Sequence, residues 1–328
     1  MTTNSSQNRA AWALLSTARG VSAAQEAAST YSDVSDASDA CAALPETSFE
    51  ILPALAQKQE ALLENLRGAG RMMVAFSGGV DSSYLAWAAH RALGDDCLSV
   101  TALSPSYPAS HRAVAEDVVE RFGLSHRFVE TDEMERESYR ANASDRCYHC
   151  KSELFETMDR LGRELGFSAT CYGVNTDDTG DFRPGHRAAA EHAVRAPFLE
   201  IGLSKAEIRS LSRAAGLPTA DLPASACLSS RLPYGTQVTV ERLGQVEQGE
   251  ENLRGLGFRQ LRLRHHGELA RIEIDPQELP RALDPEMAKR IVQAIKPLGF
   301  RYVSLDLEGY RTGSLNEVLQ VHRDEPLR

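Results

Sequence analysis

Apolar and polar positions alternate from residue 50 onward in a pattern that favours a layered α/β fold. Short runs that we interpret as strands occupy Met72–Phe76, Cys97–Leu103, His126–Glu130 and Ala169–Val174. Amphipathic segments typical of helices occupy 49–67, 80–93, 108–122 and 151–165. Strands that alternate with helices at this spacing form a parallel, doubly wound sheet with right-handed crossovers. We therefore expect ligands beyond the carboxyl ends of these strands.

The second half of the chain predicts a smaller α+β unit. The sequence Ser204-Lys-Ala-Glu207 is typical of a helix start whose two end side chains cap it, and this helix is expected to end at Gly216. An irregular stretch follows, 218–236, which we call the hinge segment. Beyond it the pattern predicts helix 239–256, strands 259–265 and 270–275 with a turn at His266-Gly267, helix 285–295 and strand 301–307.

Composition limits the functions that the chain can have. Its 328 residues exceed the usual size of one domain, and 42% hydrophobic residues suffice for a substantial core. The formal net charge of −10 does not suit a protein that grips nucleic acid. No run approaches the roughly 18 apolar residues of a membrane span. Six cysteines are too sparse for a secreted disulfide framework, so a cytoplasmic, thiol-reducing setting fits best.

The sequence Ser-Gly-Gly-Val-Asp-Ser-Ser, from Ser77 to Ser83, lies between the first predicted strand and a helix start. Glycines let backbone N–H groups converge on an anion, and the helix N-terminus carries about half a positive charge. The serines add hydroxyl donors. An ordinary strand-to-helix turn also favours glycine and serine, but the full motif in this setting predicts a phosphate site.

Three cysteines lie at positions that suggest a chemical role for their sulfur atoms. Cys147 and Cys150 form a Cys-x-x-Cys at the start of a predicted helix, where the helix N-terminus and neighbouring cations favour thiolates. Alone, the pair is compatible with a redox couple, half of a zinc site or two ordinary cysteines. Cys227 lies in the hinge segment, where nothing structural requires sulfur. Three thiolates leave one position of a metal site open; zinc with His149 as fourth ligand competes with an iron–sulfur cluster. We interpret the others as tail or core residues: Cys41, Cys97 and Cys171.

The Ser-Gly-Gly-Val-Asp-Ser motif resembles the PP-loop of the ATP pyrophosphatase family. The resemblance implies cleavage of ATP between its α- and β-phosphates, adenylation of a substrate oxygen and release of pyrophosphate. The Walker sequence Gly-x-x-x-x-Gly-Lys-Ser/Thr is absent from the chain. Transfer of the γ-phosphoryl group is therefore not the expected chemistry.

Three further segments narrow the resemblance: Asp145-Arg-Cys-Tyr-His-Cys-Lys151, the run 173–185 that begins Gly-Val-Asn-Thr-Asp-Asp and ends Arg-Pro-Gly, and Ala226-Cys-Leu-Ser-Ser-Arg231. With the PP-loop they are similar to the LarE family, ATP-dependent sulfur-insertion enzymes of nickel-pincer cofactor synthesis, over roughly residues 50–320. The implied fold is a doubly wound parallel sheet of the adenine nucleotide α-hydrolase-like type, followed by a small α+β domain. We expect these parts: a disordered Ala/Ser-rich tail (1–48), a PP-loop domain (49–217), the hinge segment (218–236), a substrate or oligomerisation domain (237–320) and a tail (321–328).

The resemblance also implies roles for matching residues. The phosphates of ATP would be bound by Ser77, Gly78, Gly79, Asp81 and Ser82, with Asp81 near the magnesium ion. Cys227 matches the sulfur-site cysteine, which one branch of the family sacrifices, leaving dehydroalanine. In another branch three cysteines hold a [4Fe–4S] cluster whose unique iron carries the delivered sulfide. Since Cys147 and Cys150 are present, we favour this branch. The implied substrate is a pyridinium-dicarboxylate mononucleotide, with sulfide or another sulfur donor, and the implied assembly is a homo-oligomer.

The predicted C-terminal domain supplies candidate substrate residues. The resemblance assigns four of them to the substrate site: Arg262, Arg264, Glu273 and Arg311. Arg262 and Arg264 lie on one face of a predicted strand, spaced to grip an anion through both guanidinium groups. The alternative is that they are surface arginines on an edge strand with Glu273 as their salt-bridge partner.

Residues that follow strand ends complete the expected nucleotide site. We assign to it Ser104, Asp178 and Arg183, which belong to segments beyond the second and fourth predicted strands. The three carboxylates of this second segment either hold magnesium or form a solvated loop: Asp177, Asp178 and Asp181.

Three other functions compete with an AMP- and pyrophosphate-forming sulfurtransferase. A tRNA thiolase of the same superfamily would use the same ATP step on a nucleobase, but the acidic balance and the absence of a Lys/Arg-rich stripe argue against nucleic acid. An amidotransferase-type synthetase would leave Cys227 without a role, and no glutaminase half is visible. A nucleotide- or metal-binding protein without turnover is the non-enzymatic alternative.

Overall fold

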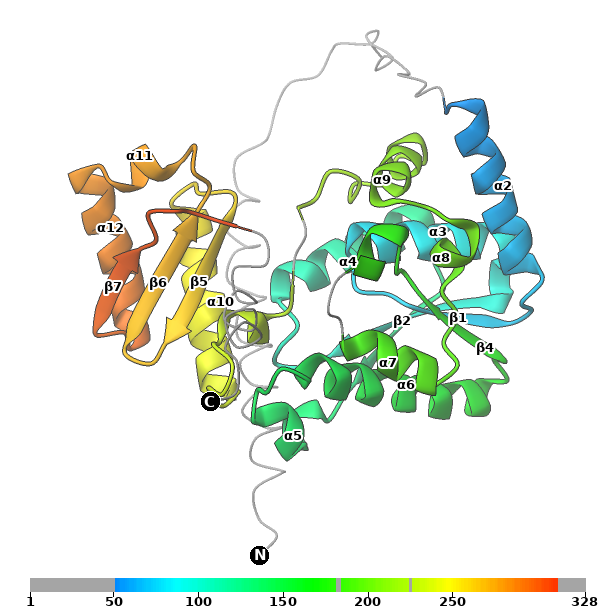
Figure 1. Ribbon diagram of the computed structural model, residues 1–328, viewed down its shortest axis with the longest axis horizontal. Coiled ribbons are helices and arrows are strands. Elements are labelled where there is room, and N and C mark those ends of the chain that lie inside the picture. The colour runs from blue at the N-terminus through cyan, green and yellow to red at the C-terminus, as the bar shows by residue number, and fades with distance from the viewer. Residues whose placement is uncertain (1–50, 181–183, 224–225, 312–328) are drawn as a thin grey trace, which may run out of the picture. The chain divides into compact units, whose positions relative to one another are not determined.

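Four parallel strands form the first sheet in the computed structural model, which describes residues 51–180, 184–223 and 226–311 (Figure 1). The strands are β1 (Met72–Ala75), β2 (Cys97–Leu103), β3 (His126–Glu130) and β4 (Ala169–Tyr172), in the order β3-β2-β1-β4. In this register Met72 of β1 pairs with Cys97 of β2 and with Ala169 of β4. The predicted doubly wound parallel sheet is confirmed.

Helices cover both faces of this sheet because the side chains of β1 alternate between them. Met72 and Val74 pack into one hydrophobic cluster, whereas Met73 and Ala75 pack into another. The first cluster draws on five helices: α2 (Pro53–Arg67), α3 (Val80–Leu93), α4 (Ala109–Phe122), α8 (Pro197–Ile201) and α9 (Lys205–Ala214). The second draws on two: α6 (Arg146–Leu165) and α7 (Pro184–Glu191). The full burial of β1 follows from this two-sided cover.

The second sheet has three strands in the order β5-β6-β7. These are β5 (Leu261–His266), β6 (Leu269–Ile274) and β7 (Tyr302–Leu305); β5 and β6 are antiparallel and β6 and β7 are parallel. Gly267, with a φ of 66°, allows the tight turn between β5 and β6 that the sequence predicts. The sheet is accompanied by α10 (Val240–Gly255), α11 (Leu279–Ala282) and α12 (Pro285–Ile295), so the small α+β unit is confirmed.

Local sequence patterns predicted some element ends correctly and missed others. The capping box of α9 is present: the Glu207 amide donates to Ser204 Oγ at 3.3 Å, and the Ser204 amide donates to Glu207 Oε2 at 2.8 Å. Helix α6 begins at Arg146, not at residue 151, and four short helical segments were not predicted: α5 (Glu137–Arg140), α7, α8 and α11. No helix in the part of the chain that the structure describes is both long and apolar enough to span a membrane.

The strand order places the topological switch point between β1 and β4, because the chain leaves β1 toward β2 and later returns to the other side of β1. Gly173, directly after β4, lies against the start of α3: a Cβ atom there would be 3.0 Å from the Asp81 carbonyl carbon and 3.0 Å from the Ser82 nitrogen. Only glycine permits this close approach of the two backbones.

Gly173→Ala is therefore expected to lower the free energy of unfolding by about 1–3 kcal/mol, the usual cost of overpacking. The matched control is Gly244→Ala in α10, where an added Cβ meets nothing within 4 Å. That substitution is expected to be neutral or to stabilise by up to about 1 kcal/mol, because alanine favours helix more than glycine does. Urea unfolding of both variants measures the difference, and equal stabilities would contradict the close approach.

Candidate functional site

The phosphate-binding loop has the geometry of an anion cradle. Gly79 is the N-cap of α3, so the loop runs directly into the first turn of that helix. The Ser77 amide donates to Ser82 Oγ at 3.1 Å, and the hydroxyls of Ser77 and Ser82 lie 3.0 Å apart. Gly78 has a φ of 74°, and a Cβ there would lie 3.1 Å from the carbonyl oxygen of His111 in α4. Hydroxyls and the free N–H groups of a helix N-terminus thus converge at one sheet edge.

Asp81, expected near magnesium, lies at the switch point with two polar partners. Its Oδ2 atom is 2.5 Å from the Lys205 ammonium at the start of α9, and its Oδ1 atom is 3.5 Å from the Asn175 amide nitrogen. Both side chains of the ion pair are partly exposed, Asp81 by 21% and Lys205 by 29%, so the pair faces solvent. Mg²⁺ is usually held by one or two carboxylates together with substrate phosphates, and Asp81 fits that role.

Lys205 was not among the predicted site residues. Its signal in the sequence was weak, because a lysine directly after a capping serine resembles any solvent-exposed first-turn residue. The structure shows why it matters: β4 and α9 bring Lys205 to the same strand edge as the phosphate-binding loop. An ammonium at this place suits a polyphosphate ligand.

Other predicted nucleotide residues have local partners. Asp178 Oδ2 accepts from the Asn175 amide at 3.1 Å, and Asp177 Oδ2 accepts from the Lys205 amide at 2.8 Å. These bonds account for both carboxylates as loop and helix-start acceptors. Arg183 and Asp181 lie outside the described residues.

Ser104, the last residue assigned to the nucleotide, contacts a buried carboxylate that the sequence did not reveal. Glu133 is 3% exposed and accepts hydrogen bonds from Ser104 Oγ and Ser106 Oγ, each at 2.7 Å. Its other oxygen lies 3.3 Å from Thr131 Oγ1 and 3.8 Å from Cys150 Sγ. Glu133 therefore joins the ends of β2 and β3 to the Cys-x-x-Cys of α6.

The Cys227 segment docks against the same region. Arg146, at the start of α6, donates to the Ser229 carbonyl at 2.8 Å, and the Tyr139 hydroxyl lies 2.7 Å from Ser229 Oγ. The Leu228 amide donates to the Ser106 carbonyl at 2.9 Å. The contacts of Leu228 and Ser229 thus hold Cys227 near the start of α6, although Cys227 follows this start by some eighty residues in the chain.

The three predicted sulfur ligands lie within electrostatic range of one another. Burial raises the pKa of the Cys150 thiol well above its usual value, and the charges of Glu133, Cys227 and Cys147 raise it further. Burial alone would lower the pKa of the Arg146 guanidinium, but Cys227 and Cys147 raise it. Within the described ranges, no three or more His, Cys, Asp and Glu side chains are arranged to hold a single metal ion. His149, the possible fourth zinc ligand, instead contacts Asp145 at 3.4 Å.

These environments predict unequal thiol reactivity. In protein prepared without iron, iodoacetamide at pH 8 is expected to label exposed Cys147 at least about tenfold faster than Cys150, because only the thiolate reacts and the pKa of Cys150 is raised. Peptide mass spectrometry over time gives both rates. In denatured protein the two rates should converge. Equal rates in the folded protein would contradict the burial of Cys150 beside Glu133.

A buried ion pair fixes the backbone at Cys227. Arg231 Nε and Nη2 donate to the two oxygens of Glu250 in α10 at 2.8 and 3.0 Å, and both side chains are at most 2% exposed. Arg231 Nη1 also donates to the Cys227 carbonyl at 2.9 Å, while Glu250 accepts from the Leu263 amide at 3.2 Å. Glu250 was missed in the sequence, although its place four residues after Val246 on the apolar side of a helix marks it as buried.

The arginines of β5 are not the exposed edge-strand residues of the alternative interpretation. Arg264 is 6% exposed and Glu273 is 1% exposed, and the two form a bidentate pair at 2.9 Å. The same alternative also included a salt bridge to Glu273, and this salt bridge is confirmed for Arg264. Arg264 Nη1 also donates to the Ser230 carbonyl at 2.8 Å, which places it beside the Cys227 segment. Its role is thus at least to position the hinge segment.

Arg262 and Arg311 lie nearby but are less enclosed. Arg262 Nη2 is 3.4 Å from the Tyr310 hydroxyl, and Arg311 Nη2 is 2.8 Å from Glu308 Oε2. Burial lowers the pKa of His111 to about 4; nearby Arg231, Arg262 and Arg254 lower it further and Glu250 opposes them, so three guanidinium groups act on this region. The field suits an anionic substrate.

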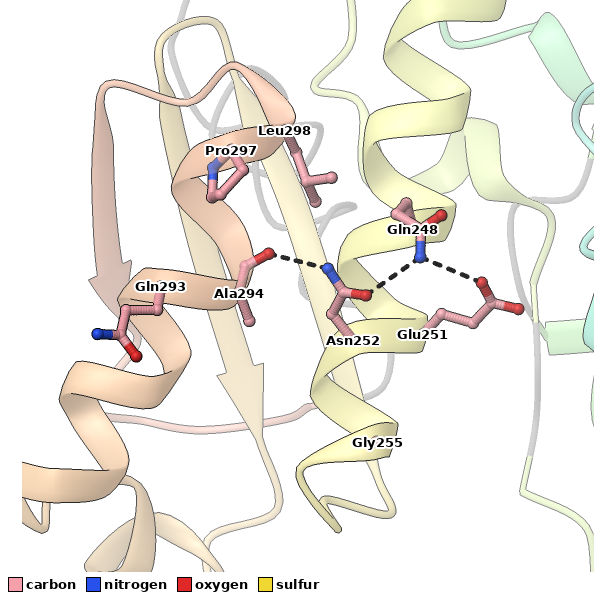
Figure 2. A pocket seen from close by; sticks show the side chains of 8 residues that line it. All are labelled: Gln248, Glu251, Asn252, Gly255, Gln293, Ala294, Pro297 and Leu298. Carbon is pink, nitrogen blue, oxygen red and sulfur yellow. Dashed lines mark hydrogen bonds between the residues drawn. The ribbon is translucent and has the colours of Figure 1, made fainter.

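One cavity in the described part of the chain has a different lining. It has a volume of about 600 Å³ and lies between α10 and α12. Figure 2 shows its lining, in which Asn252 bridges the two helices by donating to the Ala294 carbonyl at 2.8 Å and Gln248 bonds to Asn252 at 3.1 Å. No predicted site residue lines it, so the volume of a cavity does not identify the site here.

Comparison with known proteins assigns the class. The asparagine synthase family matches residues 57–150, which include the phosphate-binding loop. An uncharacterized protein of Synechocystis is 44% identical over 264 residues, which cover 79% of this chain and 98% of that protein. The pyridinium-3,5-bisthiocarboxylic acid mononucleotide synthase of Lactiplantibacillus plantarum is 33% identical over 266 residues, covering 81% of this chain and 96% of the synthase. An uncharacterized protein of Methanocaldococcus jannaschii is 26% identical over 242 residues, covering 74% and 91%.

The fold, the phosphate-binding loop and the first of these matches define an ATP-using enzyme of the PP-loop class. Within that class the chain belongs to the LarE family, since it matches the Lactiplantibacillus synthase over nearly the whole of that protein.

Proposed function

We propose that the protein is an ATP-dependent sulfurtransferase that converts a carboxylate of a pyridinium-dicarboxylate mononucleotide to a thiocarboxylate for nickel-pincer cofactor synthesis. The observation that carries the proposal is the meeting of three thiols with a PP-loop at one edge of the sheet. Cys147 and Cys150 start α6, Cys227 is held against them through Ser229, and the loop follows β1 on the same edge.

The chemistry explains why an ATP-binding loop and sulfur ligands belong in one site. A carboxylate is a poor electrophile, and attack of its oxygen on the α-phosphorus of ATP, with loss of pyrophosphate, gives a mixed anhydride with a good leaving group. A hydrosulfide ion can then attack the acyl carbon; the acyl C–O bond breaks, AMP leaves with the electron pair, and the thioacid releases a proton. Asp81 and Lys205 would hold the magnesium ion and phosphates in the first step.

The donor set fits an iron–sulfur cluster better than a single metal ion. A mononuclear zinc site needs every ligand within about 2.3 Å of one ion, whereas a [4Fe–4S] cluster spreads its thiolates over different irons. Cys147 and Cys227 both affect the pKa of Cys150 and of Arg146, so the three thiols share one neighbourhood. Cys147, Cys150 and Cys227 would hold the cluster, which would supply one iron with an open position for sulfide.

Pyrophosphate release tests the proposal. Purified protein with MgATP is expected to release pyrophosphate on addition of the pyridinium-dicarboxylate mononucleotide and not on addition of tRNA. Release that depends on tRNA would instead support a tRNA thiolase, and release with neither would support a binding protein without turnover. The homo-oligomeric state and the cytoplasmic setting remain predictions; sedimentation and cell fractionation measure them.

A further inference from the structure

We propose that Lys151 is a catalytic residue whose ammonium binds the phosphate of the adenylated carboxylate during sulfur transfer. This inference rests on the proposed function. It assigns a role to a cation that belongs neither to the phosphate-binding loop nor to the sulfur ligands. Its basis is the position of Lys151, which directly follows Cys150 in α6 and lies beside Tyr172 at the end of β4.

Lys151 lies on the side of α6 that faces the sheet. It follows Cys147 by four residues and precedes Phe155 by four, and Phe155 is fully buried in the cluster beneath the sheet. Residues four apart share one face of a helix. The ammonium of Lys151 is 5.7 Å from the ring centres of both Phe155 and Tyr172. Tyr172 ends β4, and the next residue, Gly173, touches the start of α3.

The fold reserves space for this side chain. Gly185, in α7, faces the stem of Lys151: a Cβ atom at that glycine would be 3.0 Å from Lys151 Cγ. A larger residue would press on the lysine stem where α6 and α7 pack together. The stem of Lys151 thus packs between α6 and α7, and its ammonium lies beside the ring of Tyr172 at the end of β4.

The ammonium has no carboxylate partner in the described ranges, where every ion pair of α6 involves another residue. Burial lowers the pKa of the Lys151 ammonium, whereas Cys150, Cys147 and Cys227 nearby raise it. The two aromatic rings near the ammonium offset part of the cost of its partial burial. A cation beside thiols and aromatic rings, with no carboxylate partner among the described residues, is suited to a transient anion.

The proposed chemistry supplies that anion at the right moment. When hydrosulfide attacks the acyl carbon, the acyl C–O bond breaks and its electron pair passes to an oxygen of the AMP phosphate. Negative charge on that phosphate therefore grows in the transition state. An ammonium placed in advance stabilises it, and removal of one such group typically costs about 100-fold to 1,000-fold in rate.

A single-turnover experiment separates the two steps. Anaerobic protein is mixed with MgATP, the pyridinium-dicarboxylate mononucleotide and hydrosulfide, and pyrophosphate and thiocarboxylate are measured at each time. For Lys151→Gln we expect the pyrophosphate burst to stay within about threefold of wild type and thiocarboxylate formation to slow at least about 100-fold. Lys151→Arg should retain about a tenth or more of the transfer rate because it keeps the charge. Lys289→Gln, at an exposed position of α12, is the matched control and should change neither step.

The outcomes separate this inference from the function on which it rests. A wild-type protein that releases no pyrophosphate with the mononucleotide overturns both. Wild-type turnover with unchanged transfer in Lys151→Gln overturns the role of Lys151 alone. Loss of both steps in Lys151→Gln, with no recovery in Lys151→Arg, also overturns it, because it marks Lys151 as a packing residue.

Discussion

Asp81→Asn is expected to lower ATP turnover at least about 100-fold and to leave the protein folded. The substitution preserves the shape of the side chain and removes the charge that lies 2.5 Å from Lys205. Without that charge the site loses its carboxylate for magnesium, and the Lys205 ammonium loses the partner that orients it. Pyrophosphate release in the presence of the mononucleotide measures the effect.

The same chemical change at another place provides the control. Asp95→Asn alters an exposed residue in the turn between α3 and β2, at the opposite edge of the sheet from the phosphate-binding loop. This variant should turn over ATP at the wild-type rate. Thermal melting of both variants excludes unfolding as the cause. Retained activity in Asp81→Asn would refute the role of Asp81.

Replacing any one of the three site cysteines with alanine is expected to remove the iron–sulfur absorption and abolish sulfur transfer. Protein purified or reconstituted without oxygen should be brown, whereas Cys147→Ala, Cys150→Ala and Cys227→Ala should be colourless. The pyrophosphate step should survive, because no thiol of the described residues forms a hydrogen bond with the loop from Ser77 to Ser83. Iron analysis, visible spectra and product assays give the three readouts.

Cys97→Ala is the matched control for these variants. Cys97 is 1% exposed in the hydrophobic cluster of the first sheet and begins β2, at the opposite edge of the sheet from the site. The change should cost about 1 kcal/mol of stability and leave iron content and sulfur transfer intact. Equal iron content in wild type and in all three site variants would contradict the ligand assignment.

The sequence predicted an element correctly where apolar residues alone bury it. The strand Cys97–Leu103 was predicted with the bounds that β2 has, because a strand covered on both faces is a short apolar run. The start of α6 was predicted five residues late. Its first turn holds Arg146, which is 3% exposed yet charged, so the apolar period begins only after it. A distant carbonyl, that of Ser229, allows this arginine to be buried.

The sequence predicted the local motifs of the candidate site but not the contacts between its distant residues. The PP-loop and the Cys-x-x-Cys are local patterns, so they appear in the sequence as such. Glu133, Lys205 and Glu250 act through partners far along the chain: Lys205 and Asp81 are 124 residues apart. A single sequence does not state which charged side chains fold inward, because that depends on which cations and hydroxyls meet them.

The most direct test of the central claim is mass spectrometry of both protein and nucleotide after turnover with MgATP, the pyridinium-dicarboxylate mononucleotide and hydrosulfide. We predict that one carboxylate oxygen of the nucleotide is replaced by sulfur, with AMP formed in equal amount, while Cys227 remains intact over many turnovers. Conversion of Cys227 to dehydroalanine, one sulfur lost for each product formed, would contradict the cluster route and establish a sacrificial cysteine. A nucleotide without added sulfur would contradict the proposed function itself.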